Sequence, residues 1–517
     1  MPIERVPSST QILVIGGGPA GSYSASVLAR EGFQVLLLEA AKFPRYHIGE
    51  SLLPSMRQFL EFIEAEEVVE SYGFCVKPGA AVKLNQFNRE GYTDFAADYN
   101  STWNVVRSAF DDILLKHASS CGATVVQGIK VTEVIFDRSR PVAACWQAQG
   151  DSKVEGKVCF DYLIDASGRN GVMSVKYLKN RCFNQSLKNV ALWGYWTGAN
   201  AYMPGTSRHN AVWVEALLDE SGWAWFIPLH DGTVSVGVVV DKDILADKRR
   251  ACETECHVIQ NERVYRSELE RAPGLRKLLG DARLRVQPGE SPVRMTSDFS
   301  YSARQYAGDH FRIAGDAGAF IDPFFSSGVH LALTGALSAA VTIAASIRGT
   351  APEDKAAQWH DTKVGTAYTR FLVVVLGTYK QIRNQNLAIM SDVDEDNFDR
   401  AFELIRPVIS GAADVGKTLT ENELEVRQNA CNLFAPTDPE MHKVDPKLMN
   451  SREPVMTKAE IAKAVDREDI EARMVIAEVN ARKAVHHMYK PQQNFASEVF
   501  HGMKAVVERG VLGLAAV

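Results

Sequence analysis

The segment Gln11-Ile-Leu-Val-Ile-Gly-Gly-Gly-Pro-Ala-Gly21 decides the fold of this chain. Its first five residues form a short apolar run, which is typical of a central parallel strand. The glycines match the pattern G-x-G-x-x-G, in which the turn is tight, the backbone approaches a pyrophosphate and the helix packs on the strand. A helix over about 20–30 and a strand over 35–38 are expected next, which completes one strand–helix–strand unit.

This loop predicts a dinucleotide site. The helix N-terminus offers free N–H groups and partial positive charge to phosphates. Glu39 closes the second strand, where an acidic side chain reaches ribose hydroxyls. The predicted cofactor contacts of this unit are Gly16, Gly18, Pro19, Ala20, Gly21 and Glu39. A tight turn without a ligand is the competing interpretation, and NAD would satisfy these residues as well as FAD.

The rest of the chain predicts that this first fold is interrupted and then resumed. A helix over about 105–120 and strands near 124–127, 162–164 and 311–314 are expected to extend it. Between them, Asp231-Gly232 separates two strand-like runs, which is a hairpin signal. The alanine-rich stretch 329–347 is long enough for a membrane span, but its small and polar residues indicate a buried core helix. Beyond about residue 350 the chain is expected to be helical.

Composition narrows the possible partners. Lys and Arg number 57 against 63 Asp and Glu, a net charge of -6, so no electrostatic footprint for nucleic acid or an anionic membrane is expected. A small organic substrate fits better. Among eight cysteines the close pair Cys252 and Cys256, followed by His257, lacks a second ligand pair, so no metal site is expected. Reduced thiols and the absence of a secretory leader predict a cytoplasmic protein.

Two later motifs carry a resemblance to a known superfamily. Asp165-Ala-Ser-Gly168 and Gly315-Asp316-Ala-Gly318 resemble the downstream flavin motifs of the aromatic-hydroxylase superfamily. The resemblance implies that FAD is the cofactor, that Asp316 holds its ribityl chain, and that Arg107 lies near it.

Within that superfamily the sequence most resembles the flavin-dependent halogenases, especially the fungal ones that act on free phenolic or indolic natural products. The resemblance covers about residues 10–400. Four segments carry it: the strap Pro44–Leu52 with its Gly-Glu-Ser, the segment Gly73–Lys83, the W-x-W-x-I-P signature Trp223–Pro228, and the turn Pro323–Gly328.

The family chemistry assigns roles to these segments. In such halogenases reduced FAD and dioxygen give a flavin hydroperoxide, chloride or bromide attacks it, and hypohalous acid travels to a lysine that presents the halogen to the substrate. The resemblance implies that Lys77 is this lysine, with Lys83 as its competitor, and that burial by Phe74 and Val76 lowers its pKa. Trp223 and Trp225 alternate on a strand, so both point to one face.

The remaining implied contacts concern halide and flavin. The backbone of Ser327 and Gly328, where a helix opens, is expected to bind halide, and in the family the two tryptophans separate flavin from substrate. Further cofactor contacts are predicted at Ile48, Gly49, Glu50 and Gly328. Because the chain has no second dinucleotide loop, a separate flavin reductase is expected to supply the reduced FAD.

One departure bears on the substrate. Tryptophan halogenases carry a glutamate just before the serine of the halide turn, and this chain has Phe325 there. The difference favours a substrate activated by its own hydroxyl, such as a freestanding phenolic polyketide. It leaves the deprotonating base open among His330, His209 and His230, each of which has a structural or surface interpretation.

Three alternatives stay open at this point. They are an FAD-dependent aromatic hydroxylase, a halogenase of an indole alkaloid or carrier-bound substrate, and a non-catalytic FAD-binding protein. The expected fold is α/β, with a discontinuous Rossmann-like FAD-binding domain, an antiparallel β-sheet substrate domain and a helical C-terminal region. The expected boundaries are FAD-binding parts at 8–75, 101–178 and 292–350, a substrate-side segment with the lysine at 76–100, the sheet domain at 179–291 and the helical region at 351–517.

Overall fold

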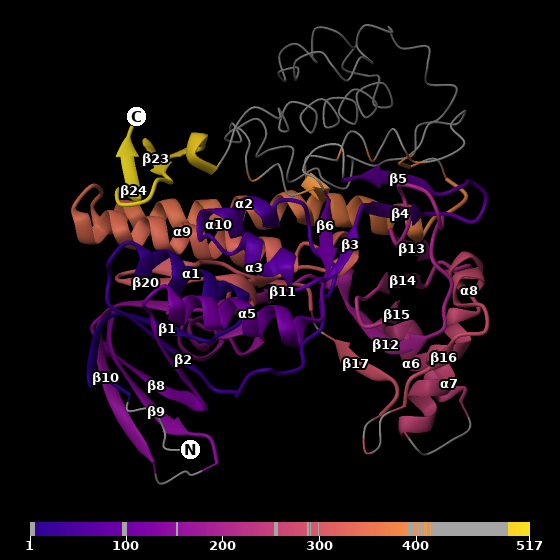
Figure 1. The fold of residues 1–517 in the computed structure, drawn as a ribbon, viewed down its shortest axis with the longest axis horizontal. Coiled ribbons are helices and arrows are strands. Elements are labelled where there is room, and N and C mark those ends of the chain that lie inside the picture. Colours follow the sequence, from indigo (N-terminus) through magenta and orange to yellow (C-terminus); the bar gives the residue numbers. More distant parts are fainter. Residues whose placement is uncertain are drawn as a thin grey trace, which may run out of the picture.

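The structure is a computed structural model, and two eight-stranded sheets form its main layers (Figure 1). It describes residues 6–95, 101–150, 154–252, 257–286, 289, 291–297, 299–387, 389–390, 398, 402, 405, 408–410, 414 and 495–517. Everything said below concerns these residues.

The first sheet is built around β1 (Ser9–Ile15), and its main path has the order β19-β20-β10-β1-β2-β7. β1 runs parallel to β2 (Val35–Glu39) on one side and to β10 (Glu155–Asp165) on the other. The outer members are β7 (Thr124–Gln127), β20 (Phe311–Ile313) and β19 (Ala307–Gly308). The strands that the sequence predicts therefore lie in one sheet and run parallel to one another, as expected, while β8, β9 and β19 join it antiparallel.

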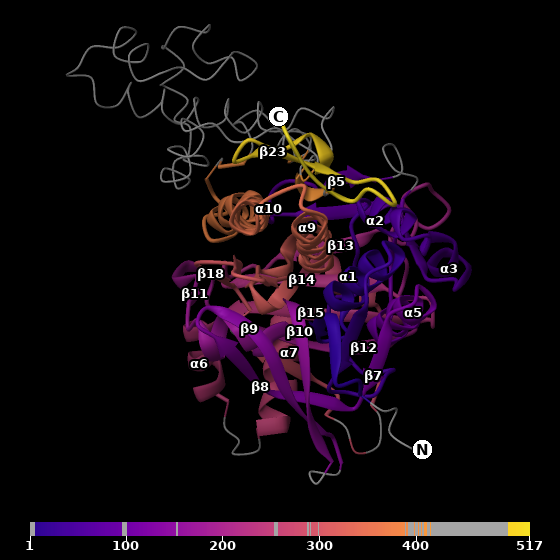
Figure 2. The ribbon, with the colours of Figure 1, turned by 90° about the vertical axis from the view of Figure 1, so that its left-hand side faces the viewer.

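The two faces of this sheet are covered by different kinds of structure. Ile12 and Val14 of β1 pack in one hydrophobic cluster with α1 (Pro19–Arg30), α5 (Arg107–Ser120) and α9 (Gly328–Arg348). Leu13 and Ile15 point the opposite way, as alternation on a strand requires, and pack with β8 (Ile129–Asp137) and β9 (Arg140–Ala148). Figure 2 shows the helices on one side of the sheet and the β8–β9 hairpin on the other.

The second sheet has the order β16-β12-β15-β14-β13-β4-β5, with β17 also paired to β12. Its strands are β4 (Gly79–Lys83), β5 (Gly91–Asp94), β12 (Asn189–Thr197), β13 (Val212–Ala216), β14 (Gly222–Pro228), β15 (Thr233–Asp241), β16 (Arg283–Leu284) and β17 (Arg294–Ser297). The expected hairpin is present as the antiparallel pair β14–β15.

This sheet differs from the expectation in two respects. It is not wholly antiparallel, because β4 enters from the N-terminal half and pairs parallel with β13. It is also wider than residues 179–291, because β4 and β5 come from the segment with the lysine and β17 begins at Arg294. The chain therefore passes between the two sheets more than once.

The alanine-rich helix is a core element. α9 is the single helix of the described residues that is long and apolar enough to cross a membrane, and 89% of its most apolar window is buried inside the protein. Figure 1 shows it running along the first sheet, next to α10 (Glu353–Ile382). Burial on all sides explains its uniform apolarity.

The C-terminal region corrects the helical expectation in part. α10 is a 30-residue helix, as expected. However, β22 (Val499–Phe500), β23 (Met503–Val506) and β24 (Gly513–Ala516) form an antiparallel three-stranded sheet rather than a helix. Alternating burial along β23 and the turn glycines Gly502 and Gly510, both at positive φ, explain the strands. Most of the expected helical region between 391 and 494 lies outside the described residues.

The remaining elements connect these layers. They are α2 (Met56–Phe62), α3 (Glu66–Ser71), α6 (Lys242–Arg250), α7 (His257–Leu269), α8 (Pro273–Leu279), the pair β3 (Cys75–Lys77) and β6 (Thr102–Asn104), and the small sheet of β11 (Arg181–Phe183), β18 (Tyr301–Ala303) and β21 (Ala319–Phe320).

Candidate active site

The glycine loop joins β1 to α1 as a close-packed turn. Gly16 has φ +102°, and a Cβ there would lie 2.3 Å from the carbonyl oxygen of Ala166. A Cβ at Gly21 would lie 1.8 Å from the carbonyl oxygen of Gly16. Neither position admits a side chain, so the two glycines set the path of the turn.

The open end of α1 is suited to phosphate. Gly18 is the N-cap and supplies no side-chain cap, Pro19 is the first helical residue, and no acidic side chain stands in the first turn. Ala20 brings the third flavin motif to this loop, because a Cβ at Gly315 would lie 3.1 Å from the Cβ of Ala20. The free N–H groups and the positive end of the helix dipole therefore lie where the glycine loop meets the motifs Asp165–Gly168 and Gly315–Gly318.

Glu39 is buried at the end of β2 and shapes the same loop. Its carboxylate accepts hydrogen bonds from the backbone N–H of Gly17 at 2.6 Å and of Ala41 at 2.7 Å. Each carboxylate oxygen of Glu39 keeps a further lone pair that could accept a ribose hydroxyl. The contact between Glu39 and the ribose stays a prediction.

Arg107 holds the strap in place. Its Nη1 donates to the carbonyl oxygens of Ile48 at 2.9 Å and Gly49 at 3.2 Å, while Asp111 binds the other side of its guanidinium. Gly49 lies at φ +102°, so the strap turns sharply at this contact. The side chain of Arg107 thus holds the predicted flavin strap by hydrogen bonds to the backbone of the strap.

Two carboxyl groups, the buried Glu50 and the partly buried Asp316, lie in the strap and in the third motif. Burial raises the pKa of Glu50 to about 7, and its Oε1 accepts a hydrogen bond from the hydroxyl of Tyr195 at 2.6 Å. Burial also raises the pKa of Asp316 to about 6, against the opposing charges of Arg107, Arg169 and Arg181. Asp316 follows β20 at the carboxyl edge of the first sheet, which is the usual ligand side of such sheets.

Unpaired polar atoms mark where a polar ligand fits. The hydroxyl of Ser51, both amide atoms of Asn104 and the hydroxyl of Ser327 are buried without a hydrogen-bond partner among the described residues. Buried polar groups are ordinarily paired in folded proteins. Ser51, which lies in the strap, pairs with Asn104 in an isolated antiparallel β-bridge. The glycine turn, the desolvated Asp316 and these atoms together fit FAD, and Asn104 was not found from the sequence.

Lys77 is fully enclosed at the end of β3. It is 2% exposed, its Nζ donates to the carbonyl oxygen of Leu52 at 2.8 Å, and it lies 5.0 Å from the ring centre of Phe95. Burial lowers the pKa of Lys77 from 10.5 to about 7. At neutral pH a substantial fraction of this amine is therefore uncharged and nucleophilic.

Lys77 and Lys83 have different environments. Lys83 is only partly buried, and its Nζ donates to the carbonyl oxygen of Asn88 at 2.5 Å. The expectation that Val76 shields Lys77 is wrong, because Val76 is 54% exposed. Neighbours on a strand point to opposite faces, and it is the ring of Phe95 and the backbone of Leu52 that lie against the amine.

The halide turn precedes α9 directly. Asp322 caps it by accepting the N–H of Phe324 at 3.2 Å, and Ser326 takes the left-handed conformation with φ 57°. α9 then begins at Gly328 with Ser327 as N-cap, and no side chain caps it or brings negative charge to its first turn. The turn thus presents backbone N–H groups and the unpaired Ser327 hydroxyl, which is a set of donors suited to an anion.

The two tryptophans share a face, as predicted. Trp223 and Trp225 lie on β14 with ring centres 5.8 Å apart, and both are buried. Trp223 meets Phe324 of the halide turn edge to face at 4.9 Å. The W-x-W segment and the halide turn therefore adjoin in one aromatic cluster, which also contains Phe325.

Of the three histidines considered as bases, only His330 is buried. His209 and His230 are exposed, whereas His330 stands in the first turn of α9 and is 1% exposed. Its Nδ1 pairs with the hydroxyl of Ser55 at 2.8 Å and its Nε2 with Asp414. Since both ring nitrogens are engaged within the protein, His330 anchors α9 and does not offer a free base.

A metal centre is not indicated by the described residues. They hold no group of three or more His, Cys, Asp or Glu side chains arranged to bind a metal ion. Cys252 is a free, partly buried thiol, and Cys256 lies outside the described residues.

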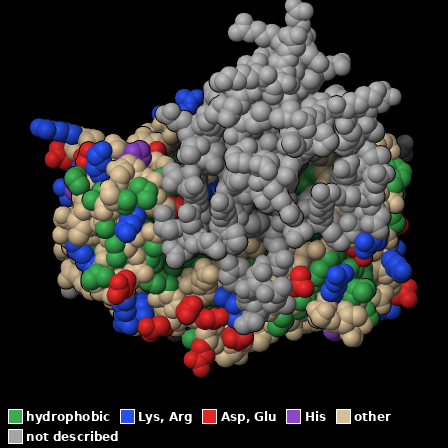
Figure 3. Space-filling model, turned by 90° about the horizontal axis from the view of Figure 1, so that it is seen from above, with side chains coloured by type: hydrophobic (Ala, Val, Ile, Leu, Met, Phe, Trp, Pro, Cys, Tyr) green, Lys and Arg blue, Asp and Glu red, His purple; other side chains and the backbone are tan. Residues whose placement is uncertain are grey.

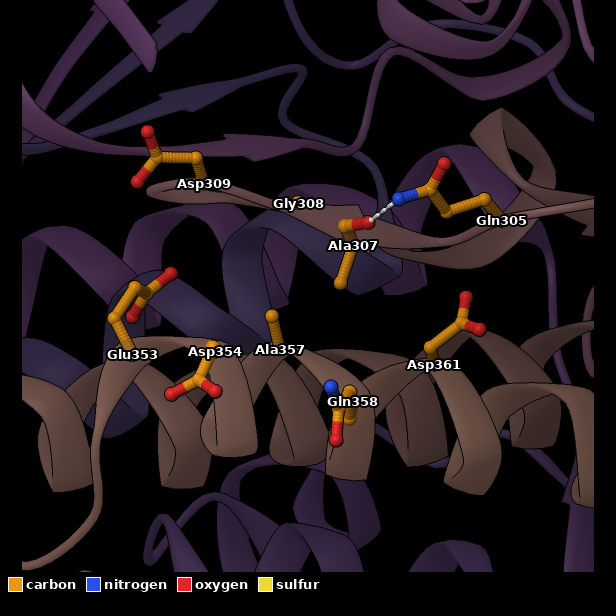
Figure 4. A pocket seen from close by; sticks show the side chains of 9 residues that line it. All are labelled: Gln305, Ala307, Gly308, Asp309, Glu353, Asp354, Ala357, Gln358 and Asp361. Atoms are coloured by element: carbon orange, nitrogen blue, oxygen red, sulfur yellow. Dashed lines mark hydrogen bonds between the residues drawn. The ribbon is translucent and has the colours of Figure 1, made fainter. Parts of the chain in front are cut away.

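Two surface hollows are lined by described residues. One, of about 500 Å³, lies between the β19–β20 turn and α10, where Asp309, Glu353, Asp354 and Asp361 gather (Figure 4). Glu353 there already pairs with Arg312 at 2.9 Å. The second, of about 540 Å³, lies on the outward side of β3 and includes Val76 and His230. On the surface that Figure 3 shows in colour, acidic and basic side chains are interspersed, as the nearly equal numbers of acidic and basic residues in the chain predict.

The fold and the site together define a flavin-binding oxidoreductase that combines a Rossmann-like FAD domain with a second β-sheet. Comparison with known proteins narrows this further. The family model described as tryptophan halogenase matches residues 11–83 and 71–406, and the chain belongs to this family.

Its relatives carry a more specific description. The flavin-dependent halogenase armH1 of Armillaria mellea is 55% identical over 526 residues and covers 99% of both chains. The sulochrin halogenase gedL of Aspergillus terreus is 45% identical over 531 residues, covering 98% of this chain and 94% of its own. The chain is thus a flavin-dependent halogenase similar to those of fungi, and FAD is its cofactor, as the sequence predicts.

Solved structures agree with the fold. The myxobacterial chondrochloren halogenase CndH, an FAD-dependent halogenase, aligns with a TM-score of 0.62 and 28% identity over 78% of this chain and 90% of its own. The flavin-dependent brominase Bmp2 aligns with a TM-score of 0.65 and 26% identity, covering 78% and 94%. The hydroxylase and non-catalytic alternatives are thereby set aside in favour of a halogenase.

Proposed function

We propose that the protein halogenates an electron-rich aromatic natural product, a freestanding phenolic polyketide, with chloride or bromide as the halogen source. Bound FAD, supplied in the reduced state, provides with dioxygen and halide the hypohalous acid that the reaction consumes. A separate reductase in the cytoplasm supplies the reduced flavin, because the chain itself contains one dinucleotide loop.

The chain binds the halide and the flavin at adjoining places. The backbone of Ser327 and Gly328, with the Ser327 hydroxyl, holds the halide through N–H and O–H donors at the positive end of α9. Gly16, Gly18 and Pro19 receive the phosphates, and Asp316 the ribityl chain. Trp223 and Trp225 form a wall of indoles that keeps the substrate from the flavin.

The buried amine of Lys77 carries the proposal. Its pKa of about 7 leaves an unprotonated nitrogen at physiological pH. This nitrogen takes halogen from hypohalous acid, so that an N–H bond is replaced by an N–Cl bond and water leaves. Transfer to the ring breaks the N–Cl bond and forms a C–Cl bond, and the proton that leaves the ring balances the one that nitrogen takes up to become the amine again. A fully charged surface lysine would be a poor nucleophile for this step.

The substrate class is supported by two observations. Phe325 occupies the place where an acidic residue would assist an indole ring, so the substrate must stabilise positive charge itself. A phenol does so at its ortho and para carbons. The relative gedL bears the name sulochrin halogenase and is 45% identical. An indole alkaloid or a carrier-bound ring remains the alternative substrate.

The experiment is a single-turnover assay. Holoenzyme with anaerobically reduced FAD receives oxygen, chloride and a panel of phenols, and product masses are read. A mass gain with the chlorine isotope pattern, lost in Lys77→Ala, supports the proposal. A gain of one oxygen, or chlorination that survives in Lys77→Ala, contradicts it. Indole products without phenol products would move the substrate class to indoles.

A further inference from the structure

Asp322, the residue before the halide turn, is held by three hydrogen bonds from three different elements. Its Oδ2 accepts from the hydroxyl of Tyr379 at 2.7 Å and from Nδ2 of Asn189 at 3.1 Å. Its Oδ1 accepts the N–H of Phe324. The carboxylate is 0% exposed, so the start of the turn is fixed by protein groups and not by water.

Tyr379 connects this carboxylate to the tryptophan wall. It lies on α10, is buried, and its hydroxyl accepts Nε1 of Trp223 at 2.7 Å and Nδ2 of Asn189 at 2.7 Å while it donates to Asp322. A phenol has one donor and two acceptor positions, so this hydroxyl is fully used. Tyr379 is therefore a junction rather than a group that could receive a proton from the substrate.

The halide turn also contacts Trp223 directly. The ring of Phe324, two residues after Asp322, meets the ring of Trp223 at 4.9 Å and 69°. A shift of Trp223 would therefore press on the halide turn. Removing the Tyr379 hydroxyl would release both partners together.

We propose that Tyr379 is a positioning residue that fixes the halide turn against Trp223 and thereby sets halide affinity. The inference rests on the proposed halide role of Ser327 and Gly328, and it places α10, outside both sheets, in control of the site.

The electrostatics of Asp322 give this role a distinct signature. Burial raises the pKa of Asp322 to about 6, and hydrogen bonds from Tyr379 and Asn189, with the charge of Arg383, oppose the rise. The groups that face it are Tyr379 of α10, Arg383 at the C-cap of that helix, Asn189 of β12 and the backbone of the turn. Because an ionised Asp322 accepts all three bonds, protonation loosens the turn as the pH falls below about 6. Loss of the Tyr379 donor would move this transition to higher pH.

The test is Tyr379→Phe, with Tyr368→Phe as the matched control. Tyr368 is buried on the same helix, but its hydroxyl accepts Nδ2 of Asn184 at 2.6 Å, away from the turn. We expect Tyr379→Phe to raise the chloride KM about tenfold, the factor for one hydrogen bond to a charged group. FAD content and the KM of the phenol should stay as in wild type, and the pH below which chloride binding weakens should shift upward. Tyr368→Phe should change none of these.

Two further measurements keep the inference separable from the proposed reaction. The chloride Kd of the oxidised holoenzyme, from ³⁵Cl NMR line broadening, requires no turnover and should also rise about tenfold. Asp322→Asn preserves the cap on Phe324 but cannot titrate, so the weakening of chloride binding below about pH 6 should vanish in the Kd measurement. The inference is overturned by an unchanged chloride KM, an unchanged chloride Kd and an unchanged pH dependence of that Kd in Tyr379→Phe, or by equal losses in both tyrosine variants. A wild type that binds chloride but halogenates nothing would count against the reaction alone.

Discussion

The Nζ of Lys77 lies 2.8 Å from the carbonyl oxygen of Leu52, and this hydrogen bond joins two parts of the site that are far apart in function. Leu52 ends the strap that Arg107 holds at Ile48 and Gly49. The lysine is therefore fixed to the same backbone segment that is predicted to face the flavin. Its amine needs no charged partner for its position, which leaves it free to lose its proton.

The first prediction concerns this amine in catalysis. Lys77→Ala should bind FAD as wild type does and lose halogenation by about 10² or more, the usual scale for loss of a group that acts on the reacting atoms. It should still release hypohalous acid, detected by chlorination of monochlorodimedone. Lys83→Ala is the control, since Lys83 is partly buried and bonds to Asn88. Equal losses in both variants would refute the assignment to Lys77.

The second prediction concerns stability and pH. The pKa of Lys77 falls from 10.5 when unfolded to about 7 when folded, so below pH 7 the folded state bears the full cost of a buried charge. Between pH 7 and 10.5 the unfolded chain binds more protons, and stability rises with pH. Lys77→Met should therefore raise the urea midpoint at pH 7 and have a smaller effect at pH 10. The same gain at both pH values would show that the amine is not desolvated.

These cases show what the sequence could and could not predict. The glycine loop, the hairpin around Asp231-Gly232 and the shared face of Trp223 and Trp225 follow from local periodicity and turn chemistry, and the structure has all of them. The shielding of Lys77 by Val76 failed because the side chain next in sequence lies on the other face of the strand. Phe95, which does lie against the amine, comes from a distant turn of the chain.

Contacts between residues far apart in the sequence are what the sequence analysis mainly failed to predict. Tyr379 hydrogen-bonds to Asp322, which is 57 positions away, and to Trp223, which is 156 positions away. No rule of sequence spacing predicts that these residues meet. The unpaired amide of Asn104 is visible only once β3 and β6 are paired. Likewise, the strands at 499–516 depend on a docking surface on α9 and α10 that the local sequence does not reveal.

The third prediction tests the cofactor turn. Gly16→Val should lose FAD, because its Cβ would overlap the carbonyl oxygen of Ala166 at 2.3 Å and because φ +102° is strained for a β-branched residue. The readout is flavin absorbance per mole of purified protein. Gly365→Ala is the control, since its Cβ would meet only an ordinary contact at 3.8 Å. A Gly16 variant with undiminished flavin would move the phosphate site elsewhere.

The fourth prediction tests the C-terminal sheet as part of the core. Trp359 of α10 is 0% exposed, donates from Nε1 to the carbonyl oxygen of Met503 at 3.1 Å, and packs against the rings of Phe495 and Phe500. Trp359→Ala should lower the free energy of unfolding by about 3–5 kcal/mol, the range for a large aromatic side chain removed from a core.

The matched control for this prediction is Val511→Ala, since Val511 lies in the same C-terminal segment but is 55% exposed. It should change the free energy of unfolding by no more than about 0.5 kcal/mol. Urea unfolding followed by fluorescence gives both values, and Trp223 and Trp225 remain as probes in the variant. If Trp359→Ala costs less than about 1 kcal/mol, the terminal strands do not pack on α10 in solution. Because α10 also carries Tyr379, a large loss of stability should be accompanied by weaker chloride binding.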